Sequence, residues 1–247
     1  MTAYGPLATL FHEAHAPAAA EAEIDWYATR LPRDAGPLLE LMVGTGRLLL
    51  PLLERGLPVH GVDASEARLA SCRARLRDRG RETELFRQNV VALNLPFRYG
   101  AAFIADGSFQ LLTGAAAALD ALLRIRAHLV EPGLLLLDLF VPAAAAHPPG
   151  AAIVEVRTAA AAEGLQIALR SETLLDVERR RMDVTNRYER RDRTAIVARE
   201  DETRALTWYT EDEALTLLVD AGYRDVRIEP AACARDDGRH FAVIAKV

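Results

Sequence analysis

Residues 38–47, LLELMVGTGR, decide the fold that we expect for this chain. A short apolar strand over residues 38–42 is followed by Gly44, Thr45 and Gly46, and then by a helical pattern. Glycine allows the chain to turn sharply and lets a ligand approach the backbone. The first N–H groups of the next helix are free to meet an anionic or strongly polar group. The stretch therefore predicts a strand–turn–helix unit that binds a ligand.

An acid stands at the end of the next predicted strand and narrows the type of ligand. That strand, residues 59–62, leads into Asp63, which lies 17 residues after Gly46. A carboxylate at this place can accept hydrogen bonds from ribose hydroxyls, which indicates a nucleoside cofactor. The NAD fingerprint needs a third glycine where this chain has Leu49, so an NAD-dependent oxidoreductase is a disfavoured alternative.

Strands and helices alternate over residues 37–150 and return over 208–247. Strands are expected over 38–42, 59–62, 84–86, 101–105 and 134–140, and helices over 47–54, from Ser65 to about 79 and over about 115–129. Near the end, Thr210 is an expected N-cap with Glu213 at the capping-box position, before strands over 226–228 and 241–245. Strands joined by helices predict an α/β fold, with a parallel sheet covered on both faces.

Two further segments follow different patterns. In residues 151–207 the period is that of antiparallel strands, because Met182, Val184, Asn186 and Tyr188 alternate with charged residues and Thr185. Segments 165–169, 174–177 and 195–198 are its expected neighbours, so this part is predicted to be an antiparallel β insertion. Residues 1–36 are expected to form an N-terminal helical cap, with a helix over 17–31.

Glu40 and the glycines after it resemble the first motif of the class I S-adenosylmethionine-dependent methyltransferases. Four further segments resemble later motifs of that Rossmann-like superfamily, and they occur in the same order. They are 59–76 VHGVDASEARLASCRARL, 103–113 FIADGSFQLLT, 128–140 HLVEPGLLLLDLF and 208–223 WYTEDEALTLLVDAGY. The resemblance spans about residues 20–245 and is to bacterial small-molecule members. It implies a seven-stranded, mostly parallel sheet, S-adenosylmethionine as cofactor with S-adenosylhomocysteine as product, and methyl transfer to O, N or C of a small molecule.

Carried over by position, the resemblance also implies the cofactor site. Its residues would be Glu40, Met42, Gly44, Thr45, Gly46, Asp63, Ala64, Asn89, Val90, Asp106, Gly107 and Ser108. The Gly-rich turn would line the methionine end, Asp63 would hold the ribose hydroxyls, and Ala64, Asn89 and Val90 would surround the adenine. Residues 106–108 would form a loop between cofactor and acceptor. Methyl transfer needs mainly position and exclusion of water, so no catalytic residue is assigned.

Two departures from the family pattern favour an alternative. Met42 replaces the first motif glycine, and Asn89 replaces the usual acid after the third strand. Met42 is expected to pack under the turn rather than to touch the substrate, and the amide of Asn89 can still donate and accept hydrogen bonds. The alternative is a catalytically weak or inactive S-adenosylmethionine-binding protein on the same fold.

Candidates on the acceptor side keep two interpretations each. Phe109 and Gln110 either line the acceptor pocket or cap a helix, and Trp208 and Tyr209 either wall the pocket or fill the core. Phe11, His12, Trp26 and Tyr27 form either a lid over the cofactor or a helix that covers the sheet edge. His12 and His240 are the only histidines considered as bases. No histidine or cysteine has metal-ligand spacing, so no metal is expected.

The composition is that of an ordinary globular protein. The net charge of −5 and pI of about 5.7 favour a small-molecule acceptor over nucleic acid. Two distant cysteines, Cys72 and Cys233, suggest neither a disulfide framework nor a zinc site. The first sixteen residues lack the features of a signal peptide, and no apolar run is long enough for a membrane span. We expect a cytoplasmic protein, as a monomer or homodimer, that acts without membrane or nucleic-acid partners.

Overall fold

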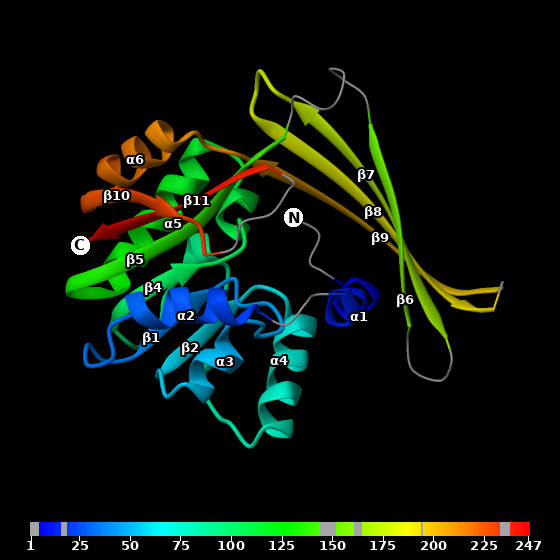
Figure 1. Cartoon of the computed structure of the whole chain (residues 1–247), viewed down its shortest axis with the longest axis horizontal. Coiled ribbons are helices and arrows are strands. Elements are labelled where there is room, and N and C mark those ends of the chain that lie inside the picture. Colours follow the sequence, from blue (N-terminus) through cyan, green and yellow to red (C-terminus); the bar gives the residue numbers. More distant parts are fainter. Residues whose placement is uncertain (1–4, 16–18, 144–151, 161–164, 194, 233–237) are drawn as a thin grey trace. The chain divides into compact units, whose positions relative to one another are not determined.

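A computed structural model describes residues 5–15, 19–143, 152–160, 165–193, 195–232 and 238–247. The chain forms two compact units (Figure 1). The smaller unit comprises Met1–Pro17 and Ala144–Thr207, and the larger unit comprises Ala18–Ala143 and Trp208–Val247. The segment 1–36, expected as one helical cap, is therefore divided between the two units.

The larger unit is built on a seven-stranded sheet in the order β10-β11-β5-β4-β1-β2-β3. Its strands are β1 (Leu38–Leu41), β2 (Val59–Asp63), β3 (Leu85–Arg87), β4 (Tyr99–Ile104), β5 (Leu129–Pro142), β10 (Arg224–Pro230) and β11 (Gly238–Lys246). Strands β1 to β5 pair in parallel, whereas β11 runs antiparallel to both β5 and β10. The predicted α/β fold with a seven-stranded, mostly parallel sheet is confirmed.

Helices cover both faces of this sheet. On one face lie α2 (Glu21–Arg30), α3 (Leu49–Glu54) and α4 (Glu66–Asp78), and on the other α5 (Ala115–His128) and α6 (Glu211–Asp220) (Figure 1). Short 3-10 turns follow β3, at Val90–Ala92, and β4, at Ser108–Leu111. Both predicted N-caps are confirmed, because Ser65 accepts from the Arg68 N–H and Thr210 forms a capping box with Glu213.

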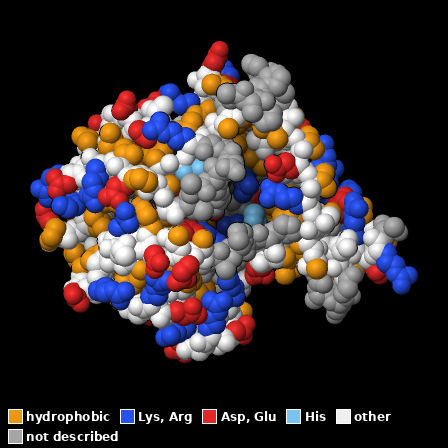
Figure 2. Space-filling view, in the orientation of Figure 1, with side chains coloured by type: hydrophobic (Ala, Val, Ile, Leu, Met, Phe, Trp, Pro, Cys, Tyr) orange, Lys and Arg blue, Asp and Glu red, His pale blue; other side chains and the backbone are white. Residues whose placement is uncertain are grey.

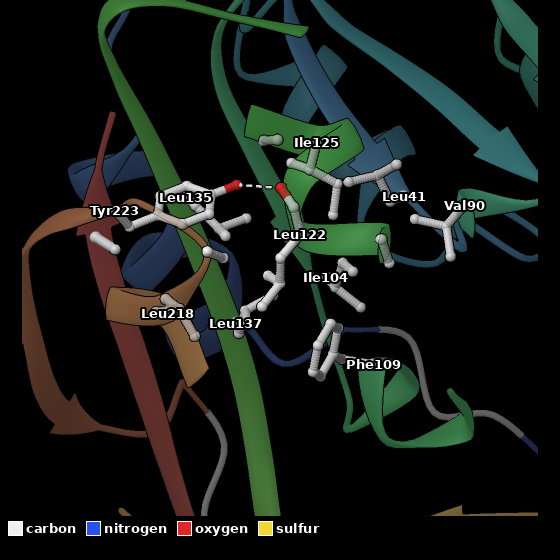
Figure 3. Packing of buried hydrophobic residues seen from close by; sticks show 14 of the residues in the cluster. Leu41, Val90, Ile104, Phe109, Leu122, Ile125, Leu135, Leu137, Leu218 and Tyr223 are labelled. Atoms are coloured by element: carbon white, nitrogen blue, oxygen red, sulfur yellow. Dashed lines mark hydrogen bonds between the residues drawn. The ribbon is translucent and has the colours of Figure 1, made fainter. Parts of the chain in front are cut away.

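Alternation along each strand divides the core into two layers. Leu135 and Leu137 of β5 face α5 and α6, together with Leu41 and Ile104, as Figure 3 shows. Leu136 points to the opposite face, which α2, α3 and α4 cover. Burial of so many aliphatic side chains is the main favourable contribution to folding, at about 25 cal/mol per Å² of apolar surface.

A buried hydrogen bond crosses the layer of α5 and α6. The hydroxyl of Tyr223 donates to the Leu122 carbonyl oxygen at 3.0 Å, seen as the dashed line in Figure 3. A buried tyrosine hydroxyl usually has such a partner. Because Tyr223 follows α6 and Leu122 belongs to α5, this bond fixes the end of α6 against α5.

The smaller unit pairs one helix with a four-stranded antiparallel sheet. Strands β6 (Ile153–Ala160), β7 (Gln166–Asp176), β8 (Arg181–Asp192) and β9 (Ala195–Thr207) follow one another in that order, as expected for the insertion. Helix α1 (Pro6–His15) packs Leu7, Ala8 and Phe11 against Ile167, Leu169 and Tyr188. The carboxylate of Glu200 accepts from the Leu7 N–H at 2.8 Å and the Ala8 N–H at 3.2 Å. An acid therefore caps the N-terminus of α1.

Several element boundaries differ from the expectation. Residues 174–177 are the end of β7 and the turn after it rather than a separate strand, and β5 already begins at Leu129, before the Pro132-Gly133 pair. The helix expected over 17–31 begins at Glu21, and Pro17 lies outside the described residues. Helix α1 and strand β6 were not predicted. Among the described residues, no helix is both long and apolar enough to span a membrane.

Gly46 gives a test of the turn after β1. Its φ is +78°, and a Cβ there would lie 2.4 Å from Leu50 Cδ1 and 2.6 Å from Cys72 Sγ. We expect Gly46→Ala to lower the free energy of unfolding by the left-handed backbone cost, about 1 kcal/mol, plus about 1 to 3 kcal/mol for overpacking. Gly80→Ala is the matched control, since Gly80 also has a positive φ, +59°, but no atom within 4 Å of the added Cβ. Equal losses in urea unfolding would contradict the steric explanation.

Candidate functional site

The turn after β1 is held in a left-handed conformation at three places. Met42 has a φ of 56°, Gly44 of 58° and Gly46 of 78°. This region favours glycine, so Met42 costs on the order of 1 kcal/mol in backbone strain. The Met42 side chain packs against the core layer of α5 and α6. This agrees with the interpretation that it lies under the turn.

Asp63 ties this turn to the end of β2. Its Oδ2 accepts from the Gly44 N–H at 2.8 Å, and its Oδ1 accepts from the Ser65 N–H at 2.8 Å. The side chain is 8% exposed. One carboxylate therefore fixes both the Gly-rich turn and the start of α4, and each oxygen keeps a lone pair for another donor.

Three acids from neighbouring strands lie on one face of the sheet. In the strand register, Glu40 on β1 pairs with Gly61 on β2 and with Phe103 on β4. Phe103 in turn pairs with Leu136 on β5. Asp63 and Asp138 lie two residues further towards the carboxyl ends of β2 and β5, and thus on the same face as Glu40. We call Asp63, Glu40 and Asp138 the carboxylate row. It marks the edge at which open α/β sheets bind ligands.

Helix α2 covers the carboxylate row. Arg47, just after the Gly-rich turn, makes a bidentate ion pair with Glu23 of α2 at 2.6 and 2.7 Å. The ring of Tyr27, also on α2, lies 5.2 Å from that of Phe103. Tyr27 is fully buried, and the charges of Asp138, Glu23 and Glu40 all act on its hydroxyl. The described part of α2 thus covers the sheet and brings polar groups to the row.

Three buried polar atoms of this cluster are unpaired within the part of the chain that the structure describes. The Tyr27 hydroxyl, Glu40 Oε2 and Asp138 Oδ1 have no hydrogen-bond partner among the described residues. Most buried polar atoms in proteins have one, so three orphaned atoms from three elements indicate a place for a ligand. Perturbed acids in such a place are candidates for function.

Two acids of the row, Glu40 and Asp138, have raised pKa values. Burial raises the pKa of Glu40 from 4.5 to about 8, although the Arg47 charge opposes this. Burial, and then the charge of Asp106, raise the pKa of Asp138 from 3.8 to about 7. Burial lowers the pKa of Arg47, but the hydrogen bond and charge of Glu23 raise it by more. Arg47 is therefore a permanent cation at this edge.

The residues expected around the adenine lie beyond Asp63 and β3. Ala64 is exposed between Asp63 and the N-cap Ser65. Asn89 is exposed, and its side chain accepts from the Val91 N–H at 3.2 Å, which caps the 3-10 turn. Val90 points into the core layer of α5 (Figure 3). Asn89 therefore has a structural bond in the place where the family carries an acid.

The loop after β4 is fixed to the end of β5. The Gly107 N–H donates to the Asp138 carbonyl at 3.1 Å, and a Cβ on Gly107 would lie 2.6 Å from the Phe140 ring. Gln110 is fully buried and exchanges two 2.9 Å bonds with the backbone of Phe140. Asp106 is exposed at the tip of this loop, with Ser108 after it. Gln110 thus joins the loop to β5 instead of capping a helix.

Other candidates have structural roles or lie elsewhere. Phe109 is buried in the core layer of α5 and α6 (Figure 3). Its ring lies 6.1 Å from that of Tyr209. Trp208 is also buried. His12 belongs to α1 in the smaller unit, beside Phe11. The His240 ring stacks on Phe140 at 5.7 Å, and its charge acts on Asp138. This brings His240 near the carboxylate row.

The described residues include no candidate metal cluster, and the cysteine among them is buried. No group of three or more His, Cys, Asp or Glu side chains there is arranged to hold a metal ion. Cys72 is buried, and burial raises the pKa of its thiol to about 12, so it is unreactive.

On the face seen in Figure 2, acidic and basic side chains of the described residues are interspersed rather than gathered by sign.

Sequence reasoning missed Glu23, Arg47 and Asp138 as members of the site. Arg47 lies inside the quoted stretch, and Asp138 interrupts the apolar run LLLLDLF. An acid inside a buried strand was a signal that could have found Asp138, because such a residue is rarely buried without a reason. Glu23 carries no comparable signal in the sequence.

A family model described as a methyltransferase domain matches residues 38–133, which include the Gly-rich turn and the carboxylate-row acids Glu40 and Asp63. No curated protein matches the chain. The predicted resemblance is thus supported in two ways: residues 38–133 match a methyltransferase domain, and the chain has the fold of solved S-adenosylmethionine-dependent methyltransferases.

Solved structures of similar fold are numerous, and three represent them. An S-adenosylmethionine-dependent methyltransferase from Clostridium acetobutylicum is 16% identical, with a TM-score of 0.75 and coverage of 96% of both chains. The sugar N-methyltransferase KedS8 from Streptoalloteichus sp. is 20% identical, with a TM-score of 0.75 and coverage of 95% of this chain and 91% of the other. The glycopeptide N-methyltransferase MtfA in complex with S-adenosylhomocysteine is 27% identical, with a TM-score of 0.60 and coverage of 93% and 88%.

The raised pKa values predict a pH-dependent stability for the free protein. Between about pH 4 and 8 the folded protein binds more protons at Glu40 and Asp138 than the unfolded chain does, so stability falls as pH rises through this window. We expect Glu40→Gln to flatten this dependence and to raise the free energy of unfolding at pH 8 by on the order of 1 to 3 kcal/mol, since one pKa unit corresponds to about 1.4 kcal/mol.

Urea unfolding at about pH 5, pH 6.5 and pH 8 measures the free energy of unfolding across this window, and thus how steeply it depends on pH. Glu82→Gln, at an exposed position, is the control and should follow the wild type. A Glu40→Gln protein with an unchanged pH dependence would show that Glu40 ionises at no cost in the folded state.

Proposed function

We propose that this protein is an S-adenosylmethionine-dependent methyltransferase that methylates a small molecule. The carrying observation is the position of Asp63 and Glu40 on one face of adjacent strands, on either side of the Gly-rich turn. Asp63 would hold the ribose hydroxyls, and Glu40 with the turn would hold the methionine end.

The chemistry of these residues fits the cofactor. S-adenosylmethionine carries a sulfonium and an ammonium, and both favour an acid-rich site with little competing cation. Glu40 Oε2 and the Tyr27 hydroxyl are buried atoms without a partner among the described residues, so they suit the ammonium and its neighbours. Arg47 already shares its guanidinium with Glu23, but its remaining N–H groups suit a carboxylate.

Once bound, the cofactor supplies an electrophilic methyl group on sulfur. The protein's own residues contribute position and exclusion of water. Asp63 holds the Gly-rich turn rigid through Gly44, and Gln110 fixes the β4 loop to β5, so the two sides of the site keep one geometry. Such alignment of reactants is the main source of rate in a displacement of this type.

We further propose that the methyl acceptor is a small molecule. The protein would act in the cytoplasm, without a nucleic-acid or membrane partner. The sugar and glycopeptide N-methyltransferases among the neighbours support an acceptor of this class. The alternative is a protein that binds S-adenosylmethionine without turnover, which Met42 and Asn89 favour. Met42 nevertheless adopts the left-handed conformation of a glycine and packs on the core, which supports a working turn.

Isothermal titration with S-adenosylhomocysteine tests the proposed cofactor site. We expect the wild type to bind it, and Asp63→Asn to bind about 10- to 100-fold more weakly. The reason is that a hydrogen bond to a charged group contributes about 1.5 to 3 kcal/mol, and about 1.4 kcal/mol corresponds to a factor of ten in Kd.

Asp78→Asn, an exposed acid on α4, is the matched control and should bind like the wild type. Absence of binding by the wild type at millimolar ligand would refute the proposal. Binding without methyl transfer to any acceptor would favour the alternative.

A further inference from the structure

Asp138 is the acid of the carboxylate row that the proposed cofactor contacts leave unused. It interrupts the apolar strand β5 and is only 4% exposed. Its carboxylate accepts from the backbone N–H of Asp106, whereas Oδ1 has no hydrogen-bond partner among the described residues. A carboxylate in an apolar strand lowers stability, so its presence there points to a function.

The strand order assigns Asp138 to the acceptor side of the site. The strands follow one another as β5-β4-β1-β2. With the ribose at Asp63 on β2 and the methionine end at Glu40 on β1, the next strands along the row are β4 and β5. Just after β4, the next residue of this face beyond Phe103 is Ala105, which has only a methyl side chain.

The groups around Asp138 come from four other elements. Asp138 interacts electrostatically with Glu23 and Tyr27 on α2, with Asp106 after β4 and with His240 on β11. Glu40 on β1 acts on the same Tyr27 hydroxyl. Asp106 and Glu23 disfavour its ionised form, and His240 favours it. The backbone here is held in place, because the Asp138 carbonyl accepts from the Gly107 N–H and Gln110 binds the backbone of Phe140, two residues further along β5.

We propose that Asp138 is a catalytic residue that binds the N–H of an amine acceptor and takes its proton. This inference rests on the proposed methyltransferase function. The nitrogen lone pair forms the bond to the methyl carbon while the carbon–sulfur bond breaks, and its electron pair stays on the sulfur of S-adenosylhomocysteine. The nitrogen, now cationic, transfers its proton to the Asp138 carboxylate, which later releases it to water.

The environment of Asp138 suits this role. A pKa of about 7 lets the side chain exist as base and as acid near neutral pH, which is the best condition for proton transfer. A neutral amine attacks with its own lone pair and needs a base only for the cationic product. A neutral alcohol is a much weaker nucleophile and must lose its proton before or during the attack, which requires a far stronger base than a carboxylate. The row therefore favours amines over alcohols as acceptors.

The experiment uses the full chain and four variants. The variants are Asp138→Asn, Asp138→Glu, Glu40→Gln and Glu131→Gln, and each is compared with the wild type. Titration gives the affinity for S-adenosylhomocysteine, thermal unfolding gives the melting temperature, and a third assay measures methyl transfer to amine probes. The probes are D-glucosamine, benzylamine and spermidine, each beside an alcohol counterpart, namely D-glucose, benzyl alcohol and 1,4-butanediol. Glu131, an exposed acid at the start of β5, is the matched control.

We expect the wild type to methylate at least one amine and none of the alcohols. Asp138→Asn should lose about 100-fold or more in kcat while it keeps the S-adenosylhomocysteine affinity and a melting temperature no lower than that of the wild type. The increase of wild-type kcat with pH near neutrality should be absent in Asp138→Asn, and Asp138→Glu should restore part of the rate. A merely structural role would not change the pH profile in this way.

Three results would overturn the inference while leaving the cofactor site intact. They are wild-type binding of S-adenosylhomocysteine without methylation of any amine, equal amine methylation by wild type and Asp138→Asn, and a loss of affinity in Asp138→Asn as large as that in Glu40→Gln. A wild type that does not bind S-adenosylhomocysteine refutes the proposed function itself, so the two failures are distinguishable.

Discussion

The carboxylate of Asp63 is the constraint on which the site depends. By accepting from the N–H groups of Gly44 and Ser65, it joins the turn after β1 to the helix after β2. A loop with three left-handed residues has high intrinsic freedom, and two charge-assisted hydrogen bonds remove much of it. The relative positions of the site are therefore fixed before any ligand binds. This applies to the first turn of each helix, to the glycine backbone and to the acids at the strand ends.

The carboxylate row has a cost in stability that the rest of the unit must offset. Glu40 and Asp138 are surrounded by aliphatic layers, and their ionised forms are poorly solvated there. Arg47 provides the nearby positive charge, but Glu23 already neutralises most of it. A site with an excess of unmet negative character is suited to cationic ligands, and it is most stable as a free protein when partly protonated.

Local patterns predicted most of the fold, because they report interactions between near neighbours. The Gly-rich turn, the N-caps at Ser65 and Thr210, and the alternation in β8 each follow from contacts within a few residues. Helix α1 and strand β6 were missed, since α1 is stabilised by Ile167, Leu169 and Glu200, all far away in the sequence. At the site, Asp63 and Glu40 could be found from motifs. Glu23 and Asp138 depend on which helix covers which face of the sheet, and no local pattern reports that.

The connection between α1 and β9 also affects the order in which the chain can fold. The Leu7 N–H and the Glu200 carboxylate that caps it are 193 residues apart. During synthesis, the apolar face formed by Leu7, Ala8 and Phe11 leaves the ribosome long before the strands that bury it. The larger unit can form most of its parallel sheet in that interval, but its last helix and strands come after β9. Completion of both units is therefore a late event, and a chain stopped before β7, which supplies Ile167 and Leu169, would expose an apolar helix to chaperones or to aggregation.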